Sequence, residues 1–567
     1  MFKKSESQQF DLFESIEGFL SDRKQKIFSD PSCWHNTFYS DVTSRIDESI
    51  FSVLYSSKMG RCNAPIRVLL GMCILKDGNG WSDEQLFRHC RFDLQVIRAL
   101  GYTNMKEDIP VEATYYSFRK AIKEYEQSTG IDLLDECFTK ITSGQIESYK
   151  VSGEKVRMDS KLINSNIRRS TRLEMILETV RVFTTDKTIN ISLLSEVMDE
   201  QDYHLLKLLK KKTVSNITYS LDAKGEKALL HRLGFILKQL LSYFPKSRHY
   251  SVANQIYEDH YHLNQEDSNN NDNKEDAGLD QDQSSQLKDS KEVKSDSIQS
   301  IHDPDAAYRT KGKGASKQNI TGYHANITET CGNDNTVNLI LSVEVSRANV
   351  SESEFLFPSI NASEKVLEQA NPTGTNKIKQ VTNDGGYDSV ENREKMREAN
   401  SPSWNMSKIK GRELVFEFSY DKEGKPIVQD AKTKELYQIN YSEKLKKYVI
   451  IRPNKKARRY FTKQQIEDYI FLQKIMDGKT EEDKKLRPNV ESAIHQTFHR
   501  LEKRKKIKYR GLLKCKTYVY FRAIWVNFSR ILKQKLELSS FLIIFLLRVL
   551  TNNLICRNQI YPKSSKV

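Results

Sequence analysis

Three acidic residues stand where carboxylates from separate elements could converge. Asp159 ends the alternating segment 155–158, Asp384 precedes a glycine pair after a second strand-like segment, and Glu491 lies on a helix-like segment near the C-terminus. Enzymes that transfer phosphoryl groups with two divalent ions need such convergence, because the ions activate the attacking oxygen and stabilise the leaving one. Magnesium prefers oxygen ligands and keeps several waters, so two or three carboxylates are enough.

The same acids also have an ordinary explanation. The chain holds 75 acidic residues, so some of them end strands or begin turns by chance. Asp before Gly-Gly is common turn chemistry, and Glu491 could pair with Arg487 on a helix surface. Spacing alone therefore leaves both a catalytic triad and structural roles open.

Positive charge is concentrated near the C-terminus. The 567 residues carry a net charge of +15, and residues 451–567 alone hold 28 Lys and Arg against 9 Asp and Glu. Residues 258–300 show the opposite bias, with 12 acids and 4 lysines. A localised surplus favours a nucleic-acid surface over a diffusely basic protein, while solubility alone could explain the overall charge.

The elements that must position these groups change type along the chain. Residues 1–150 read as helical: the apolar run 66–75 is broken at 76–80, and Ser82 with Gln85 fits a capping box. The pair of helices could be a helix-turn-helix or part of an ordinary bundle. Further on, the patterns predict a strand at 155–158, helices over 168–245, paired strands at 322–330 and 337–345, a helix at 353–370, a strand before Asp384, a β insertion at 411–461 and a basic helix from residue 489.

Composition sets further expectations. Residues 254–300 are polar and acidic and predict a disordered linker, because they offer little apolar surface to bury. The eight cysteines include no Cys-x-x-Cys pair, so we expect a reduced, cytoplasmic protein without structural zinc. No secretory signal is visible, and the apolar run 541–547 is too short for a membrane span and predicts a packed helix.

Several segments together resemble the bacterial insertion-sequence transposases of the DDE superfamily. Arg157-Met-Asp159 resembles the strand with the first Asp of that family, and Asn383-Asp384-Gly-Gly-Tyr387 resembles the turn with the second. Arg487-Pro-Asn-Val-Glu491 matches the Arg-x-x-x-Glu helix of the family. Supporting stretches lie at 63–70, 81–86, 114–119, 302–308, 322–325, 509–514 and 525–530. The resemblance covers most of residues 30–535.

The resemblance implies an α/β fold with an RNase H-like mixed sheet flanked by helices. It implies a helical N-terminal DNA-binding or dimerisation domain (1–150), a catalytic domain (151–535) and a C-terminal helix or tail (536–567). We expect the catalytic domain to hold a helical insertion at about 168–300, including the disordered linker 254–300, and a small β insertion at 395–480.

The implied activity is cleavage and strand transfer of DNA at insertion-sequence ends. Asp159, Asp384 and Glu491 would be the catalytic residues and would bind two Mg²⁺ or Mn²⁺ ions. The partners would be terminal inverted repeats and target DNA, with a homodimer or larger synaptic assembly, nucleoid association and no membrane. Phosphate contacts would come from the basic C-terminal region. These DNA-binding candidates are Arg487, Arg500, Lys503, Arg504, Lys505, Lys506, Lys508 and Arg510.

Two departures from the family pattern concern these DNA contacts. The tyrosine often found three residues before the motif's Arg is Lys484, and the basic residue often found seven after the Glu is Phe498. Two rival functions also stay open: a transposase-derived DNA-binding protein without catalysis, and a nuclease on the same fold without strand transfer. A solvated basic helix face is the ordinary alternative for 503–510.

Overall fold

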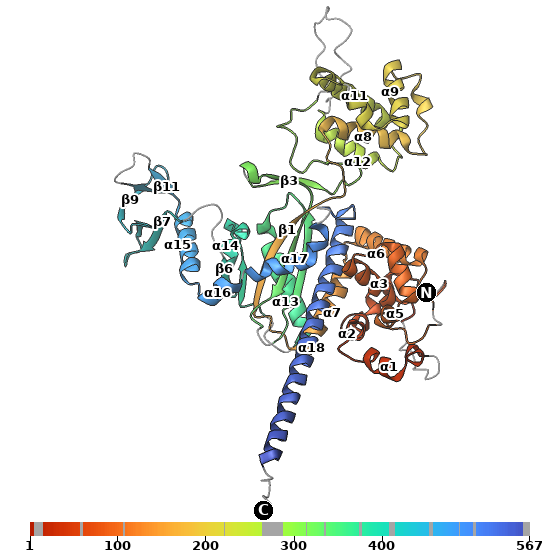
Figure 1. Ribbon diagram of the computed structural model, residues 1–567. Helices are drawn as coiled ribbons and strands as arrows, with labels where there is room; N and C mark the ends of the chain where they lie inside the picture. The colour runs from red at the N-terminus through yellow and green to blue at the C-terminus, as the bar shows by residue number, and fades with distance from the viewer. Residues whose placement is uncertain are drawn as a thin grey trace, which may run out of the picture.

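The computed structural model describes most of the chain. The described ranges are 1–4, 15–56, 60–105, 108–219, 221–262, 287–312, 314–333, 336–372, 377–406, 414–452, 458–486, 488–502 and 506–559. Within them, a central mixed sheet carries helices on its faces, and two further units extend from it (Figure 1). This confirms the mixed α/β sheet flanked by helices that the sequence predicts.

The central sheet is built around β1 (Lys155–Asn164). On one side β1 pairs antiparallel with β3, which pairs antiparallel with β4, and on the other side it pairs parallel with β5, followed by β6. The remaining strands are β2 (Ala307–Lys311), β3 (Gln318–Thr330), β4 (Ile340–Arg347), β5 (Gln380–Asn383) and β6 (Ser403–Met406). The predicted strand pair 322–330 and 337–345 is thus confirmed as β3 and β4.

Short helical segments connect these strands. They are η5 (Gly314–Ser316), η6 (Glu352–Phe355), α13 (Leu356–Ala370), η7 (Gly385–Tyr387) and α14 (Val390–Met396). The connections on either side of β5 matter most for the site. The segments η6 and α13 lead into β5, and η7 follows it directly. Val156 and Met158 of β1 share an apolar cluster with Leu356 and Ile360 of α13, so α13 covers one face of the sheet.

The N-terminal region is helical, as predicted. Its elements are η1 (Ile16–Phe19), α1 (Asp22–Phe28), α2 (Trp34–Asp41), η2 (Thr43–Arg45), η3 (Glu48–Leu54), α3 (Ile66–Asn79), α4 (Asp83–Phe92), α5 (Leu94–Ala99), α6 (Glu112–Thr129) and α7 (Leu133–Tyr149). The capping box of Ser82 and Gln85 is present at the start of α4. Gly80 ends α3 in the left-handed conformation, with φ 71°, which glycine adopts without steric cost.

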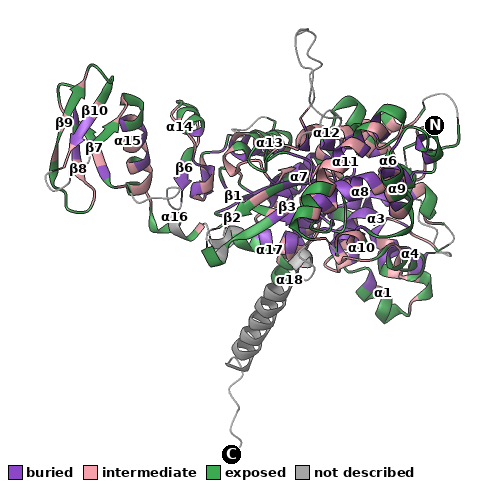
Figure 2. Cartoon of the chain, turned by 90° about the horizontal axis from the view of Figure 1, so that it is seen from above, coloured by how far each residue is buried: buried purple, intermediate pink, exposed green. Residues whose placement is uncertain are grey.

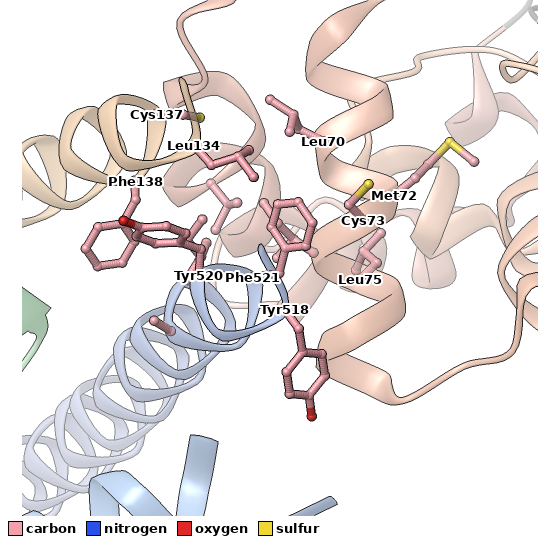
Figure 3. Close-up of a cluster of buried hydrophobic side chains, with 14 of the residues drawn as sticks. Leu70, Met72, Cys73, Leu75, Leu134, Cys137, Phe138, Tyr518, Tyr520 and Phe521 are labelled. Carbon is pink, nitrogen blue, oxygen red and sulfur yellow. The ribbon is translucent and has the colours of Figure 1, made fainter. Parts of the chain in front are cut away.

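This helical region shares its core with the C-terminal helix α18 (Leu512–Gln559). Figure 3 shows side chains of α3, α7 and α18 meeting in one cluster. Trp525 of α18 lies so close to Gly78 of α3 that a Cβ on Gly78 would overlap its ring, so the sequence expectation that Trp525 packs is confirmed. The boundary that we place at residue 150 is therefore no boundary of the hydrophobic core.

The helical insertion forms a unit with its own core. It comprises α8 (Arg172–Thr185), η4 (Ile191–Leu194), α9 (Glu200–Lys211), α10 (Val214–Thr218), α11 (Ala223–Tyr243) and α12 (Tyr250–His260). The expected disordered linker 254–300 needs correction at both ends, because 254–260 belong to α12 and Ile298 is buried in this core. Ile256 and Ile298 supply apolar surface that the average composition conceals. Residues 263–286 lie outside the described part.

The β insertion forms a second small unit. Its five-stranded antiparallel sheet consists of β7 (Phe416–Tyr420), β8 (Pro426–Asp430), β9 (Leu436–Ser442), β10 (Lys447–Ile451) and β11 (Arg459–Phe461). Helix α15 (Lys463–Asp477) packs its Ile466 against Phe416 and Phe418 of β7. Figure 2 shows this unit apart from the central sheet, with exposed residues along its outer strands. The short α16 (Glu481–Leu486) and then α17 (Pro488–Glu502) return the chain to the core.

Among the described residues, no helix combines the length and the apolar character that crossing a bilayer demands. The run 541–547 falls inside α18.

A partly buried carboxyl on β4 makes stability depend on pH. Burial raises the pKa of Glu344 to about 7, with Asp132 and Asp135 adding to the shift and Lys516 opposing it. In the unfolded chain this carboxyl ionises near its ordinary pKa of 4.5. Between these two values the folded state binds more protons than the unfolded state, so stability falls as pH rises.

We therefore expect Glu344→Gln to stabilise the protein above pH 7, by on the order of 1 kcal/mol, and to lose this advantage below pH 5. Thermal unfolding of both proteins at pH 5 and pH 8 measures the effect. An equal difference at both pH values would show that Glu344 is not the titrating group.

Candidate functional site

Two of the three predicted acids lie on neighbouring parallel strands. The register pairs Val156 with Val381 and Arg157 with Thr382. Continued by two residues, the same register places Asp159 opposite Asp384, just beyond the end of β5. Burial raises the pKa of Tyr387 well above its ordinary value, and the nearby carboxylates of Asp159, Glu352 and Asp384 raise it further. The structure therefore brings Asp159 and Asp384 to one place.

Local backbone contacts hold both aspartates. Asp384 is the N-cap of η7, and its Oδ1 accepts a hydrogen bond from the Gly386 amide at 2.7 Å. Oδ1 of Asp159 accepts one from the Ser160 amide at 2.8 Å. Contrary to expectation, Asp159 does not end its strand, because β1 runs on to Asn164 along the long strand β3. It stands instead beyond the last residue that pairs with β5.

The third acid, Glu491, lies on α17 and is exposed. Helix α17 packs against β1, since Ile494 and Phe498 share an apolar cluster with Ile163. Arg157 ties the end of α16, just before α17, to the sheet, because its Nη1 donates to the carbonyl of Leu486 at 3.1 Å. Over the described part of the chain, no group of three or more His, Cys, Asp or Glu side chains stands ready-made to hold a metal ion.

Arg157 belongs to a buried ion network that sequence reasoning missed. Its Nε donates at 2.6 Å to Glu329 on β3, and Nη1 of Arg530 on α18 donates to the other oxygen of Glu329 at 2.5 Å. Glu329 is fully buried. This network joins β1, β3 and α18, and through the Leu486 carbonyl it also holds the end of α16, which precedes α17.

The predicted DNA-binding residues are only partly described. Arg487, Lys503, Arg504 and Lys505 lie outside the described residues, and Arg500 is placed in α17 without its side chain. The three remaining cations make backbone contacts. Lys506 Nζ donates to the Ile167 carbonyl at 2.5 Å, Lys508 Nζ to that of Gly80 at 3.3 Å, and Arg510 Nε to that of Asn166 at 2.9 Å. These contacts fasten the loop between α17 and α18, while Lys508 and Arg510 stay exposed.

A cationic pocket lies along the second half of β1, beyond Asp159. It has a volume of about 540 Å³, and its lining includes Lys161, Arg169, Lys317 and the ring of Phe498. Because side chains alternate along a strand, Lys161 projects on the same side of β1 as Asp159, about 7 Å further on. In the sequence, the Asp-x-Lys spacing at 159–161 is the signal that places a cation on the same side of the strand as Asp159.

Three other acids near these segments, Asp303, Asp305 and Asp388, make structural contacts. Asp303 is buried and accepts hydrogen bonds from the Tyr323 hydroxyl and the Gly511 amide, and Asp305 accepts from the Leu512 amide at the start of α18. Both oxygens of Asp388 accept hydrogen bonds from the Arg393 guanidinium, from Nε and Nη2 at 2.7 Å each, so this carboxylate has a cationic partner.

Comparison with known proteins gives one match. Residues 29–121 match the family model described as Transposase domain (DUF772). No curated protein and no solved structure was found to match the chain. The matched segment runs from the end of α1 into α6 and so lies within the helical N-terminal region. The match supports a transposase, that is, an enzyme acting on DNA.

Proposed function

We propose that this protein is a DDE transposase with an RNase H-like core, which cleaves DNA at the ends of an insertion sequence and joins those ends to target DNA. The observation that carries the proposal is the parallel register of β1 and β5, which leads Asp159 and Asp384 to the same level. The transposase domain at 29–121 supports the same function independently.

The types of donor atom proposed here suit Mg²⁺ or Mn²⁺. Asp159, Asp384 and Glu491 offer carboxylate oxygens, which hard divalent ions prefer, from two strands and a helix that packs against β1. A pair of such ions supplies activation of an attacking oxygen and stabilisation of a leaving oxygen at phosphorus. In this proposal the three side chains hold the ions, and the arrangement of β1, β5 and α17 sets their directions.

In this proposal the basic residues position DNA, and the reaction takes two steps. The first reaction is attack of water on the phosphodiester at the end of the element, which breaks one P–O bond and frees a 3′-OH. In the second, that 3′-OH attacks a phosphodiester of target DNA, and the displaced strand leaves with its own 3′-OH. Both are in-line displacements, so one site serves both. Two ends must be joined, so we propose a homodimer or larger synaptic assembly, associated with the nucleoid.

A cleavage and joining assay tests the proposal. It combines the full chain, DNA that carries the ends of the element, and Mg²⁺. We expect cleaved ends and, with target DNA present, joined products that sequencing maps to those ends. Cleavage without joined products would favour the nuclease alternative, and binding without cleavage would favour the non-catalytic one. Inverted repeats in the DNA that brackets the gene would identify the substrate.

The cationic pocket gives a prediction about binding. Replacing Lys161, Arg169 and Lys317 by Glu is expected to weaken DNA affinity at least tenfold and to flatten its salt dependence, because fewer phosphates are neutralised. Titrations at several salt concentrations measure this. The matched control reverses Lys422, Lys425 and Lys444 on the β insertion, which are exposed. Equal losses in both variants would indicate non-specific attraction and remove the pocket from the DNA path.

A further inference from the structure

A second pocket lies where helix α6 meets the beginning of α18, and we call it the α6–α18 pocket. Its volume of about 410 Å³ falls within the usual range of ligand pockets. Its floor is apolar and includes Ile122 of α6, Leu134 of α7 and Phe521 of α18, all of them buried. Figure 3 shows Leu134 and Phe521 within the cluster that these helices share. Such a floor suits a flat apolar group better than a hydrated ion.

Cationic side chains also line the α6–α18 pocket. Arg119 and Lys123 come from α6, and Lys514 comes from α18. Burial lowers the pKa of Lys514, and the nearby charges of Lys123 and Arg119 lower it further. Asp303 opposes this shift. The three cations are therefore close enough to repel one another, and an anion bound between them relieves that repulsion.

The acids in the lining of the pocket are engaged elsewhere. Oε1 of Glu124 lies 3.4 Å from Nζ of Lys120, and Oε1 of Glu126 lies 3.3 Å from the Nζ of a lysine on α18. Lys123 and Lys514 form no ion pair with any residue that the structure describes. The pocket therefore combines an apolar floor with positive charge that the protein leaves available to an anionic ligand.

An aromatic ring forms a further wall of the pocket and is held in place. Tyr509 lies in the loop between α17 and α18, and its hydroxyl donates to Oδ1 of Asp77 on α3 at 2.8 Å. The guanidinium carbon of Arg119 lies 5.4 Å from the centre of the Tyr509 ring. Aromatic rings and arginine side chains next to positive charge are the groups on which the bases of single-stranded nucleic acids stack.

The loop that carries Tyr509 also borders the cationic pocket along β1. The Ile507 amide donates at 2.9 Å to the carbonyl of Asn164, which lines that pocket, and Tyr509 follows two residues later. Lys508 and Arg510 flank Tyr509 and are exposed. Positive charge therefore continues from one pocket to the other along this loop. This continuity favours a DNA strand over a free small anion as the ligand.

We propose that the α6–α18 pocket binds one unpaired nucleotide of a DNA strand. Lys123 and Lys514 hold its phosphate, and its base lies against the Tyr509 ring and the apolar floor. A nucleotide within a duplex does not fit this description, because its base is paired and stacked between its neighbours. The inference rests on the proposed function, since it takes DNA as the substrate, and it adds a site for a strand that has left the duplex.

Binding of DNA with and without a single-stranded tail tests this inference in the absence of cleavage. The full chain is titrated in EDTA with a blunt duplex and with the same duplex carrying a thymidine tail, and fluorescence anisotropy gives both affinities. We expect wild type to bind the tailed duplex about tenfold more tightly, the gain that stacking of one base supplies. The double variant Lys123→Gln and Lys514→Gln should lose most of this preference, because the phosphate of the unpaired nucleotide loses its partners.

A second double variant provides the matched control. Lys224→Gln with Lys227→Gln removes the same charge from α11 of the helical insertion, where both side chains are exposed. This variant should keep the wild-type preference for the tailed duplex. If the pocket variant does not fold, Lys514→Gln alone is measured, because that side chain is exposed.

Three results would overturn the inference. They are equal affinity of wild type for both DNAs, an unchanged tail preference in the pocket variant, and removal of that preference by free thymidine monophosphate at the concentration of the tailed DNA. The last of these would identify a free nucleotide as the ligand. The proposed function fails separately, because absence of cleavage and joining with Mg²⁺ refutes a transposase and leaves the tail preference measurable.

Discussion

Asp159→Asn and Asp384→Asn are each expected to lower the rate of DNA cleavage by about a thousandfold or more. Each change replaces a carboxylate with a neutral amide at the level where β1 and β5 end their pairing. The loss of charge stabilisation at the reacting phosphate corresponds to several kcal/mol. DNA affinity should stay within about threefold of wild type, because most of it comes from contacts to phosphates elsewhere. Single-turnover cleavage and a gel-shift titration measure the two quantities.

The matched control for these variants is Asp388→Asn. It lies four residues beyond Asp384 but pairs with Arg393, so it should affect folding rather than the reaction itself. Its cleavage rate, corrected for the folded fraction, should remain close to wild type. Full cleavage by both the Asp159 and the Asp384 variants would refute the assignment of these residues.

Glu329→Ala is expected to lower the free energy of unfolding by about 3–5 kcal/mol. It leaves Arg157 and Arg530 without their shared carboxylate, and Arg157 is itself buried. An uncompensated buried charge is far more costly than the loss of an exposed ion pair. Denaturant unfolding followed by circular dichroism measures the change.

Replacing the three charges together provides the control. The triple variant Arg157→Met, Glu329→Leu and Arg530→Met removes all of the charge at similar volume, so stability should return close to wild type. Its cleavage rate should nevertheless be lower than that of wild type, since methionine in place of Arg157 cannot donate a hydrogen bond to the Leu486 carbonyl at the end of α16. A triple variant as unstable as Glu329→Ala would mean that packing, and not charge, dominates at this position.

Local signals predicted much of the fold. The capping box at Ser82 specified the start of α4, and alternation and turn residues specified β3 and β4, because these signals depend on neighbouring residues. The register between β1 and β5 depends on residues more than 200 positions apart, so spacing alone left the pairing of Asp159 with Asp384 open, and the family resemblance favoured it. The geometry of those strands is in keeping with that hypothesis.

Other features depended on tertiary contacts that no single-sequence pattern encodes. Glu329 looked like one more polar residue on a strand, yet it is buried between arginines from β1 and α18. Ile298 was concealed in an acidic segment, because average composition does not show which single side chain reaches a core.

The long C-terminal helix has a consequence for how such a gene can change. Helix α18 shares one hydrophobic core with α3 and α7 through Tyr518, Phe521 and Trp525. This core therefore needs both the N-terminal region and the C-terminal helix. Exchange of the N-terminal region alone between related genes would pair α3 and α7 with a different α18, and we expect such a core to pack poorly. A nonsense mutation ahead of residue 512 would remove α18 and expose apolar side chains of α3 and α7 to water, so we expect the shortened chain to be degraded.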